Sequence, residues 1–116
     1  MRLLVVEDDA LQRGMIADLI QSTDMNVMQC ESGEAASLLL EKFGGCLSLM
    51  ITDVGLAGAM TGLRLADFAK KRFPGLDVII MSGDNQPDLP VGTTFMLKPC
   101  DAQAVIRAAE TSTSRH

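Results

Sequence analysis

Short apolar runs alternate along the chain with stretches in which apolar residues recur at the helical period. The runs have strand length, and unbroken apolar runs are typical of strands buried on both faces of a sheet. The run 25–30 is more polar than the others, which predicts a strand at the edge of the sheet. The predicted strands are 3–6, 25–30, 47–52, 78–81 and 94–97.

Four stretches between and after these runs have the pattern of amphipathic helices. Small polar residues that can cap a helix, or glycine and proline that end one, mark their limits. The predicted helices are 11–20, the stretch from the Ser32 cap through Phe43, the stretch from Gly62 to Pro74, and the stretch after the Asp101 cap, with a frayed tail at 111–116. The residues expected to share a face are Leu11, Met15, Ile16, Leu19 and Ile20 in the first helix, Leu63, Ala66, Ala69 and Phe73 in the third, and Val105, Ala108 and Ala109 in the last.

Strands that alternate with helices indicate parallel βαβ units. The sequence therefore predicts a single domain, 1–116, of the α/β class: a doubly wound five-stranded parallel sheet with helices on both faces. The segment 83–93, between the last two strands, contains two Pro and two Gly and only two large apolar residues. These residues disfavour a regular helix, so we expect a loop with at most one helical turn. The fourth helix of a doubly wound fold, which would lie between these two strands, is therefore expected to be short or absent.

Composition argues against several properties for this chain: nucleic-acid binding, membrane spanning and disulfide-based structure. The net charge is −5, from 10 basic and 15 acidic residues, and the chain has four Phe but no Tyr or Trp. Nucleic-acid binding through a basic face or through base stacking is therefore not expected. The chain has no apolar run near 18 residues, so no membrane span is expected. Cys30, Cys46 and Cys100 lie far apart without a CxxC motif, which predicts reduced thiols and a cytoplasmic location.

Polar residues stand where four of the predicted strands end. Glu7 and Asp8 follow the first strand, Asp53 the third, Ser82 the fourth and Lys98 the fifth. Because the carboxyl ends of parallel strands share one edge of the sheet, these side chains are expected to converge there.

Grouped carboxylates repel each other unless a cation joins them, and Mg²⁺ prefers oxygen ligands of this kind. A carboxylate can also act as a nucleophile toward a phosphoryl group whose charge a metal and an ammonium neutralise. This chemistry would make Asp53 the nucleophile, Glu7 and Asp8 the metal ligands, and Lys98 the counter-charge, while Ser82 would offer a hydroxyl to the phosphoryl group. The structural alternatives are that Asp53 caps a turn, that Ser82 bonds its own turn, and that the acids cap the first helix, as is expected of Asp9.

Four motifs in order, Val6–Asp9, Ile51–Val54, Met81–Gly83 and Lys98–Pro99, resemble the receiver domain of two-component response regulators, the CheY-like family. The resemblance covers nearly the whole chain. It implies the flavodoxin-like strand order 2-1-3-4-5 and a stand-alone receiver, without an effector domain, that acts as a phosphorylation-dependent switch or a phosphorelay intermediate.

The resemblance also implies site roles. Asp53 would accept a phosphoryl group from a sensor histidine kinase. Mg²⁺ would bind Asp53, the acidic pair Glu7 and Asp8, and the backbone carbonyl of Gly55. Such a receiver is a signalling phosphoacceptor rather than an enzyme, although it assists its own phosphorylation and dephosphorylation. The downstream protein partner is not identified by the sequence.

Three further positions match the family. Ser82 would supply the hydroxyl that moves toward phosphorylated Asp53, and Phe95 would be the switch aromatic residue that changes rotamer. Lys98 would be the family's site lysine, with a cis peptide bond between Lys98 and Pro99. Phe95 would otherwise be read as an ordinary core residue of a short strand.

The chain also departs from the family pattern. Ala57 stands where the family often has proline, and Gly62 follows Asp53 by nine residues, so this loop is one residue longer than the commonest form. The interval from Ser82 to Lys98 is several residues shorter than usual, which removes most of the fourth helix. The stretch Asp77–Asp84 resembles a subgroup paired with HWE-type kinases, but lacks its tyrosine.

Three other functions fit the same fold less well. A phosphorylation-independent interaction module would have no need of the acceptor and acidic pair that this chain keeps. A dehalogenase-type phosphatase would need a second Asp two residues after Asp53, where Gly55 stands. A flavin-binding protein would need a phosphate-cradling loop where Glu7, Asp8 and Asp9 would repel the phosphate.

Overall fold

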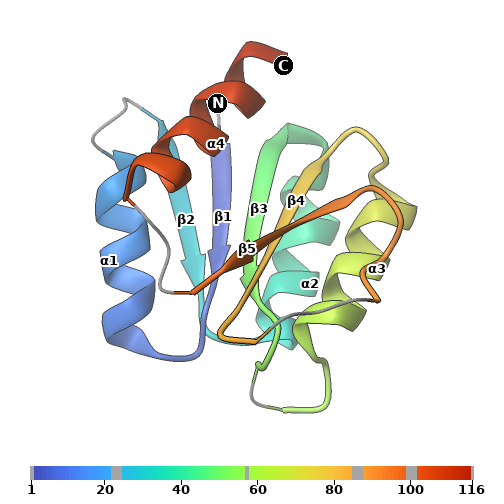
Figure 1. Ribbon diagram of the computed structural model, residues 1–116. Helices are drawn as coiled ribbons and strands as arrows, with labels where there is room; N and C mark the ends of the chain where they lie inside the picture. Colours follow the sequence, from blue (N-terminus) through green and yellow to red (C-terminus); the bar gives the residue numbers. More distant parts are fainter. Residues whose placement is uncertain (1, 22–24, 57, 85–87, 99–101, 116) are drawn as a thin grey trace.

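The computed structural model describes residues 2–21, 25–56, 58–84, 88–98 and 102–115. Strands and helices alternate along the chain (Figure 1). In chain order the elements are β1 (Arg2–Val6), α1 (Ala10–Gln21), β2 (Asn26–Cys30), α2 (Gly33–Phe43), the 3₁₀ turn η1 (Gly44–Cys46), β3 (Leu47–Asp53), α3 (Gly62–Arg72), β4 (Asp77–Ser82), β5 (Thr93–Leu97) and α4 (Ala102–Arg115).

The five strands form one parallel sheet in the order β2-β1-β3-β4-β5. The apolar runs of β1, β3 and β4 are almost entirely buried, whereas the edge strands β2 and β5 are partly exposed. This burial explains why β1 and β4 contain unbroken apolar runs and why β3 is apolar apart from the buried Ser48 and Thr52, whereas the edge strands are more polar. The predicted fold class and strand order are confirmed.

Each face of the sheet has its own apolar core, and Figure 1 shows α1 and α4 over one face and α2 and α3 over the other. Alternate residues of each strand point to opposite faces, so each inner strand contributes to both cores. The core under α2 and α3 includes Leu4, Val6, Met50, Val78 and Ile80, and the core under α1 and α4 includes Leu3, Val5, Leu49, Ile51 and Met81. No helix of the described residues is long and apolar enough to cross a membrane.

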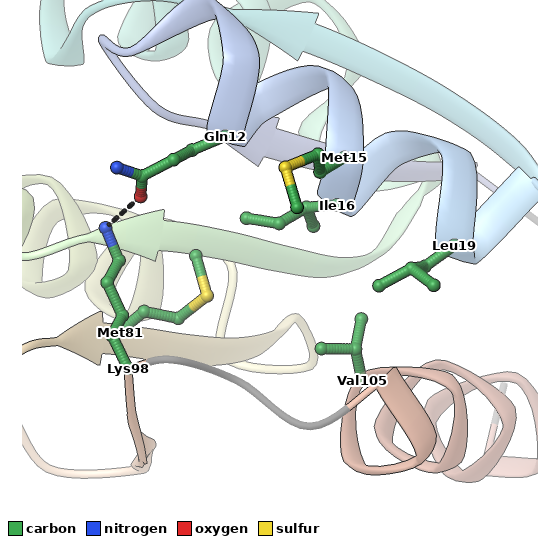
Figure 2. Close-up of a pocket in the computed structure, with 7 residues that line it drawn as sticks. All are labelled: Gln12, Met15, Ile16, Leu19, Met81, Lys98 and Val105. Carbon is green, nitrogen blue, oxygen red and sulfur yellow. Dashed lines mark hydrogen bonds between the residues drawn. The ribbon is translucent and has the colours of Figure 1, made fainter.

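The face predicted for the first helix is partly wrong. Ile16 and Ile20 are buried with Ala17, but Leu11 is 74% and Met15 59% exposed. Leu11 lies in the first turn, and Met15 borders a pocket of about 380 Å³ between α1, β4 and α4 (Figure 2). The apolar arc on this helix is therefore wider than the stripe that the sheet covers, and the small Ala17 makes the close contact.

The predicted face of α3 is confirmed but incomplete, and the predicted tail is wrong. Ala66 and Ala69 are buried and the partly buried Leu63 and Phe73 pack against the same core, which also includes Leu65, a residue that was not predicted. The expected frayed tail is helical through Arg115. Ser112, which is 3% exposed, donates a hydrogen bond from Oγ to the backbone oxygen of Ser48 at 3.0 Å. A serine can be buried once its hydroxyl is bonded in this way, so polar composition did not indicate an exposed tail.

The segment between β4 and β5 has no helix in its described parts, 83–84 and 88–92. Leu89 packs against the core under α2 and α3, and the chain turns into β5 at Gly92, whose φ is +86°. The prediction of a loop in place of a helix between β4 and β5 is confirmed for these residues.

Candidate functional site

The carboxyl ends of β1, β3 and β5 bring Glu7, Asp53 and Lys98 together at one edge of the sheet. Glu7 and Asp8 directly follow β1, Asp53 is the last residue of β3, and Lys98 directly follows β5. Because β1, β3, β4 and β5 follow one another across the sheet, side chains from distant parts of the sequence meet at this edge without any long loop. The convergence predicted from the strand ends is confirmed for these four residues.

Lys98 contacts three side chains of this cluster and its surroundings. Its Nζ lies 2.7 Å from Asp53 Oδ1 and 2.8 Å from Glu7 Oε1, and it donates a hydrogen bond to Gln12 Oε1 at 2.9 Å (Figure 2). An ammonium has three N–H donors, so these three acceptors use all of them. The side chain of Lys98 is 22% exposed, which leaves the ion pairs partly shielded from solvent.

Glu7 is only 1% exposed, although it is an acidic residue at the edge of the sheet. Burial raises its pKa, and the neighbouring acids Asp8 and Asp53 act in the same direction, while Lys98 opposes them. The backbone around Glu7 is also held, because Arg13 Nη1 donates to its carbonyl oxygen at 2.8 Å.

Partial burial alone would lower the pKa of Lys98, but hydrogen bonds to Asp53 and Glu7 outweigh burial and raise the pKa above 10.5. The ammonium is therefore protonated at any physiological pH. It supplies a fixed positive charge beside Asp53, which is the charge that a developing phosphoryl anion would need.

Glu7, Asp8 and Asp53 together have the donor set of a hard-cation site. One oxygen from each carboxylate lies within 4.8 Å of the others. Glu7 is buried, Asp53 half-buried and Asp8 exposed, so the group opens to solvent on the Asp8 side. Oxygen donors grouped with one exposed side suit Mg²⁺, which usually keeps several waters.

The loop after β3 holds Asp53 from its other side. The Gly55 amide donates to Asp53 Oδ2 at 3.2 Å, so Gly55 lies beside the carboxylate, while the predicted role of its carbonyl as a metal ligand stays a prediction. Farther along, the Ala59 amide donates to Glu34 Oε2 at 3.1 Å, which ties this loop to the start of α2. Gly62 then packs so closely that a β-carbon there would overlap the carbonyl oxygen of Asp53.

Ser82 ends β4, the strand next to Asp53, and Phe95 lies one strand farther away on β5; neither belongs to the ion-pair cluster. Ser82 is buried, and its Oγ accepts a hydrogen bond from the Asp84 amide at 3.1 Å, so it bonds its own turn. Phe95 is half-buried opposite Ile80 in the β4–β5 pair. The predicted cis bond to Pro99 and the departure at Ala57 lie outside the described residues.

Two contacts were not predicted from the sequence: Gln12 with Lys98, and Glu34 with the loop after β3. Asp9 does cap α1, since its Oδ1 accepts from the amides of Leu11 and Gln12 at 2.9 and 3.1 Å. This cap places Gln12 in the first turn of α1, beside the end of β1. The feature of the sequence that could have predicted the contact of Gln12 with Lys98 is therefore the position of Gln12 three residues after the Asp9 cap.

Comparison with known proteins agrees with this arrangement. The family model of the response regulator receiver domain matches residues 3–110. An NtrX-like response regulator of Rickettsia bellii (strain RML369-C) is 35% identical over 95 residues, which are 80% of this chain and 19% of that protein. The two-component response regulator ORR6 of Oryza sativa subsp. japonica is 33% identical over 121 residues, covering 92% of this chain and 68% of that protein.

The fold is shared with solved receivers. A response regulator receiver domain protein from Clostridium thermocellum superposes with a TM-score of 0.89 at 22% identity, and the match covers 98% of this chain and 94% of that one. The family match spans most of the chain, including both the acidic pair after β1 and the lysine after β5. The chain belongs to the response regulator receiver domain family of two-component signalling.

Proposed function

We propose that Asp53 accepts a phosphoryl group from the phosphohistidine of a sensor histidine kinase, with Mg²⁺, and that the chain acts in the cytoplasm as a phosphorylation-dependent switch or phosphorelay intermediate. The observation that carries the proposal is the 2.7 Å ion pair between Lys98 Nζ and Asp53 Oδ1 inside a cluster of three carboxylates. Lys98 also pairs with Glu7 at 2.8 Å, so the ammonium lies between two acids of the cluster, where it can neutralise negative charge that develops at Asp53.

Asp53 is the best placed nucleophile of the three acids. Glu7 is buried and Asp8 is exposed, whereas Asp53 is half-buried and oriented by Lys98 on one oxygen and by Gly55 on the other. In the reaction a carboxylate oxygen of Asp53 forms a bond to phosphorus. The phosphorus–nitrogen bond breaks, and its electron pair stays on the imidazole nitrogen of the kinase.

The carboxylates of Glu7, Asp8 and Asp53, with the backbone carbonyl of Gly55, would hold Mg²⁺. Their oxygen donors and their spacing fit a hard cation. When bound, the ion neutralises negative charge on the phosphoryl oxygens. The same groups serve transfer to Asp53 and later hydrolysis, so the chain is a phosphoacceptor that assists its own chemistry rather than an enzyme with a separate substrate.

The switch involves Ser82 and Phe95. After phosphorylation Ser82 Oγ would leave the Asp84 amide and donate to a phosphoryl oxygen, which pulls the turn after β4 toward Asp53. Phe95, which is half-buried on the adjacent strand, would change rotamer and alter the face presented to a downstream protein. The resemblance of Asp77–Asp84 to the HWE-paired subgroup makes kinases of that type the first donors to assay.

Incubation with acetyl phosphate and Mg²⁺, followed by intact-mass analysis, tests the proposal. We expect one added phosphoryl group in the wild type and none in Asp53→Asn or without metal. Asp18→Asn is the matched control, because Asp18 is an exposed acid on α1 that does not belong to the cluster of Glu7, Asp8 and Asp53. This control should be phosphorylated like the wild type.

Phosphorylation that persists in Asp53→Asn would overturn the assignment of the acceptor. Wild-type protein that binds Mg²⁺ but gains no phosphoryl group from acetyl phosphate or from phosphorylated HWE-type kinases would favour a phosphorylation-independent interaction module.

A further inference from the structure

We propose that Gln12 is a positioning residue for Lys98, and that it orients the ammonium toward the phosphoryl group without adding a fourth negative charge. The proposal rests on the proposed function of Asp53, and concerns how one group of that same site is held. Its observation is the 2.9 Å hydrogen bond that Lys98 Nζ donates to Gln12 Oε1 (Figure 2).

The direction of the ammonium depends on having three acceptors. Lys98 has a long side chain with several free torsions, and an ammonium bound by only two acceptors can still rotate about them. Asp53 and Glu7 supply two acceptors, at 2.7 and 2.8 Å, and Gln12 supplies the third. With all three N–H groups engaged, the position of Nζ is fixed before any phosphoryl donor arrives.

Gln12 is itself held on a rigid element. Its backbone amide donates to Asp9 Oδ1 at 3.1 Å, in the cap of α1. The amide side chain therefore reaches Lys98 from a helix start rather than from a loop. Positioning groups on helices hold geometry more closely than those on loops.

Gln12 is uncharged, which is favourable beside the three carboxylates of the site. Three carboxylates already lie within 4.8 Å of one another, so a fourth acid would add repulsion toward an anionic phosphoryl donor. A glutamine gives the same carbonyl-type acceptor with no charge.

The three hydrogen bonds of the Lys98 ammonium would change differently during phosphoryl transfer. As Asp53 takes the phosphoryl group, the N–H that had bonded Asp53 turns to a phosphoryl oxygen. The bonds to Glu7 and Gln12 persist, so the ammonium pivots about two fixed acceptors. Without Gln12 it would pivot about one, and would spend less time aligned with the developing charge.

Gln12→Met tests this role, because methionine keeps the chain length and removes the acceptor. We expect the rate constant for phosphorylation of Asp53 by acetyl phosphate to fall about three- to tenfold, the effect of one hydrogen bond to a charged group at a partly solvated site. The dissociation constant for Mg²⁺ should stay within about twofold, because neither Gln12 nor Lys98 is a metal ligand. The matched control is Gln21→Met at the other end of α1, where the side chain is exposed, and its rate should equal the wild-type rate.

A double-mutant cycle asks whether Gln12 acts through Lys98. In a Lys98→Met background, Gln12→Met should change the rate no further. Equal fold-losses in both backgrounds, or a wild-type rate in Gln12→Met, would overturn the proposal.

A second measurement does not depend on phosphorylation. The ¹H–¹⁵N signal of the Lys98 ammonium, assigned by its loss in Lys98→Met, should be slowed in solvent exchange in the wild type. In Gln12→Met that exchange should accelerate severalfold, because one N–H then faces water. Unchanged exchange would refute the role of Gln12. Accelerated exchange with no phosphorylation of the wild type would uphold the contact and reject the proposed function of Asp53.

Discussion

Besides the role proposed for it in phosphoryl transfer, the charge of Lys98 compensates acidic groups in the folded protein. It compensates Glu7, whose carboxylate is buried, and Asp53, whose carboxylate is half-buried. Removing one partner of a buried charge pair leaves the other without compensation. The site is therefore a source of stability that depends on the cation remaining in place.

Lys98→Met should lower the free energy of unfolding at pH 7 by about 1–3 kcal/mol, less than for a fully buried pair because Lys98 is partly exposed. Urea denaturation in metal-free buffer measures it. Lys71→Met is the control: Lys71 pairs with Asp67 at 3.0 Å on the surface of α3, and should change stability by less than about 1 kcal/mol. Equal losses in the two variants would contradict the structural role of Lys98.

The pKa of Glu7 sets a pH dependence. Burial raises this pKa above its ordinary value of 4.5, so the folded protein binds the proton more tightly than the unfolded chain. The contribution of Glu7 is fully present below pH 4.5 and is lost as pH rises through the raised pKa. The raised pKa of Lys98 has the same sign, but acts only above about pH 10.5.

As the pH rises above 4.5, the unfolding free energy of the wild type should fall because of Glu7, and Glu7→Gln should remove this fall. Urea titrations at a series of pH values in metal-free buffer check this. Superimposable slopes for Glu7→Gln and wild type would show that burial of Glu7 leaves its pKa unchanged.

At the scale of single elements, two helical glycines differ in what surrounds them. A β-carbon on Gly62, at the start of α3, would overlap the Asp53 carbonyl, whereas one on Gly14, within α1, would meet nothing within 4 Å. The start of α3 therefore packs directly on the end of β3. This contact is one reason that the carboxylate of Asp53 has a defined position.

Gly62→Ala should destabilise the protein by about 1–3 kcal/mol, because the backbone at Asp53 must shift. Gly14→Ala should instead stabilise it by about 0.5–1 kcal/mol, because alanine is the better helix former. Thermal or urea unfolding of the two variants gives the comparison. A neutral Gly62→Ala would show that the start of α3 can move away from β3 at little cost.

The strands could be predicted from sequence more closely than the helix faces. Strands buried on both faces need apolar side chains at every position, so β1 and β4 stand out as unbroken runs. Helical periodicity gives an apolar arc but not its rotation against the sheet. That is why Leu11 was expected in the core while Ala17 occupies it. The burial of Ser112 depends on one hydrogen bond across the fold, which local sequence does not encode.

At the scale of the whole molecule, the site could be predicted as far as it follows from topology. Glu7, Asp53 and Lys98 lie at strand ends, and parallel strands put those ends together. Gln12 contacts Lys98 and Glu34 contacts the loop after β3, both from the starts of helices, and these contacts depend on how each helix enters the fold. Side-chain directions of that kind follow from tertiary packing, so the sequence left them unpredicted.

The acidic cluster also predicts a coupling between metal and global stability. Mg²⁺ that binds only the folded protein should raise the free energy of unfolding by about 2.7 kcal/mol at 100 times its dissociation constant. Thermal denaturation at increasing Mg²⁺ concentrations measures the effect. Asp8→Asn should remove most of the shift, whereas Asp18→Asn should retain it. A full shift in Asp8→Asn would exclude Asp8 from the cation site.

The bond from Lys98 to Glu7 joins residues 91 positions apart, and that from Lys98 to Gln12 joins residues 86 apart. Lys98 follows β5, an edge strand that pairs with β4 alone. Detachment of this one strand would withdraw the ammonium while the carboxylates stayed on the inner strands. Local opening of β5 would thus take apart the cluster of Glu7, Asp53 and Lys98 without global unfolding of the domain.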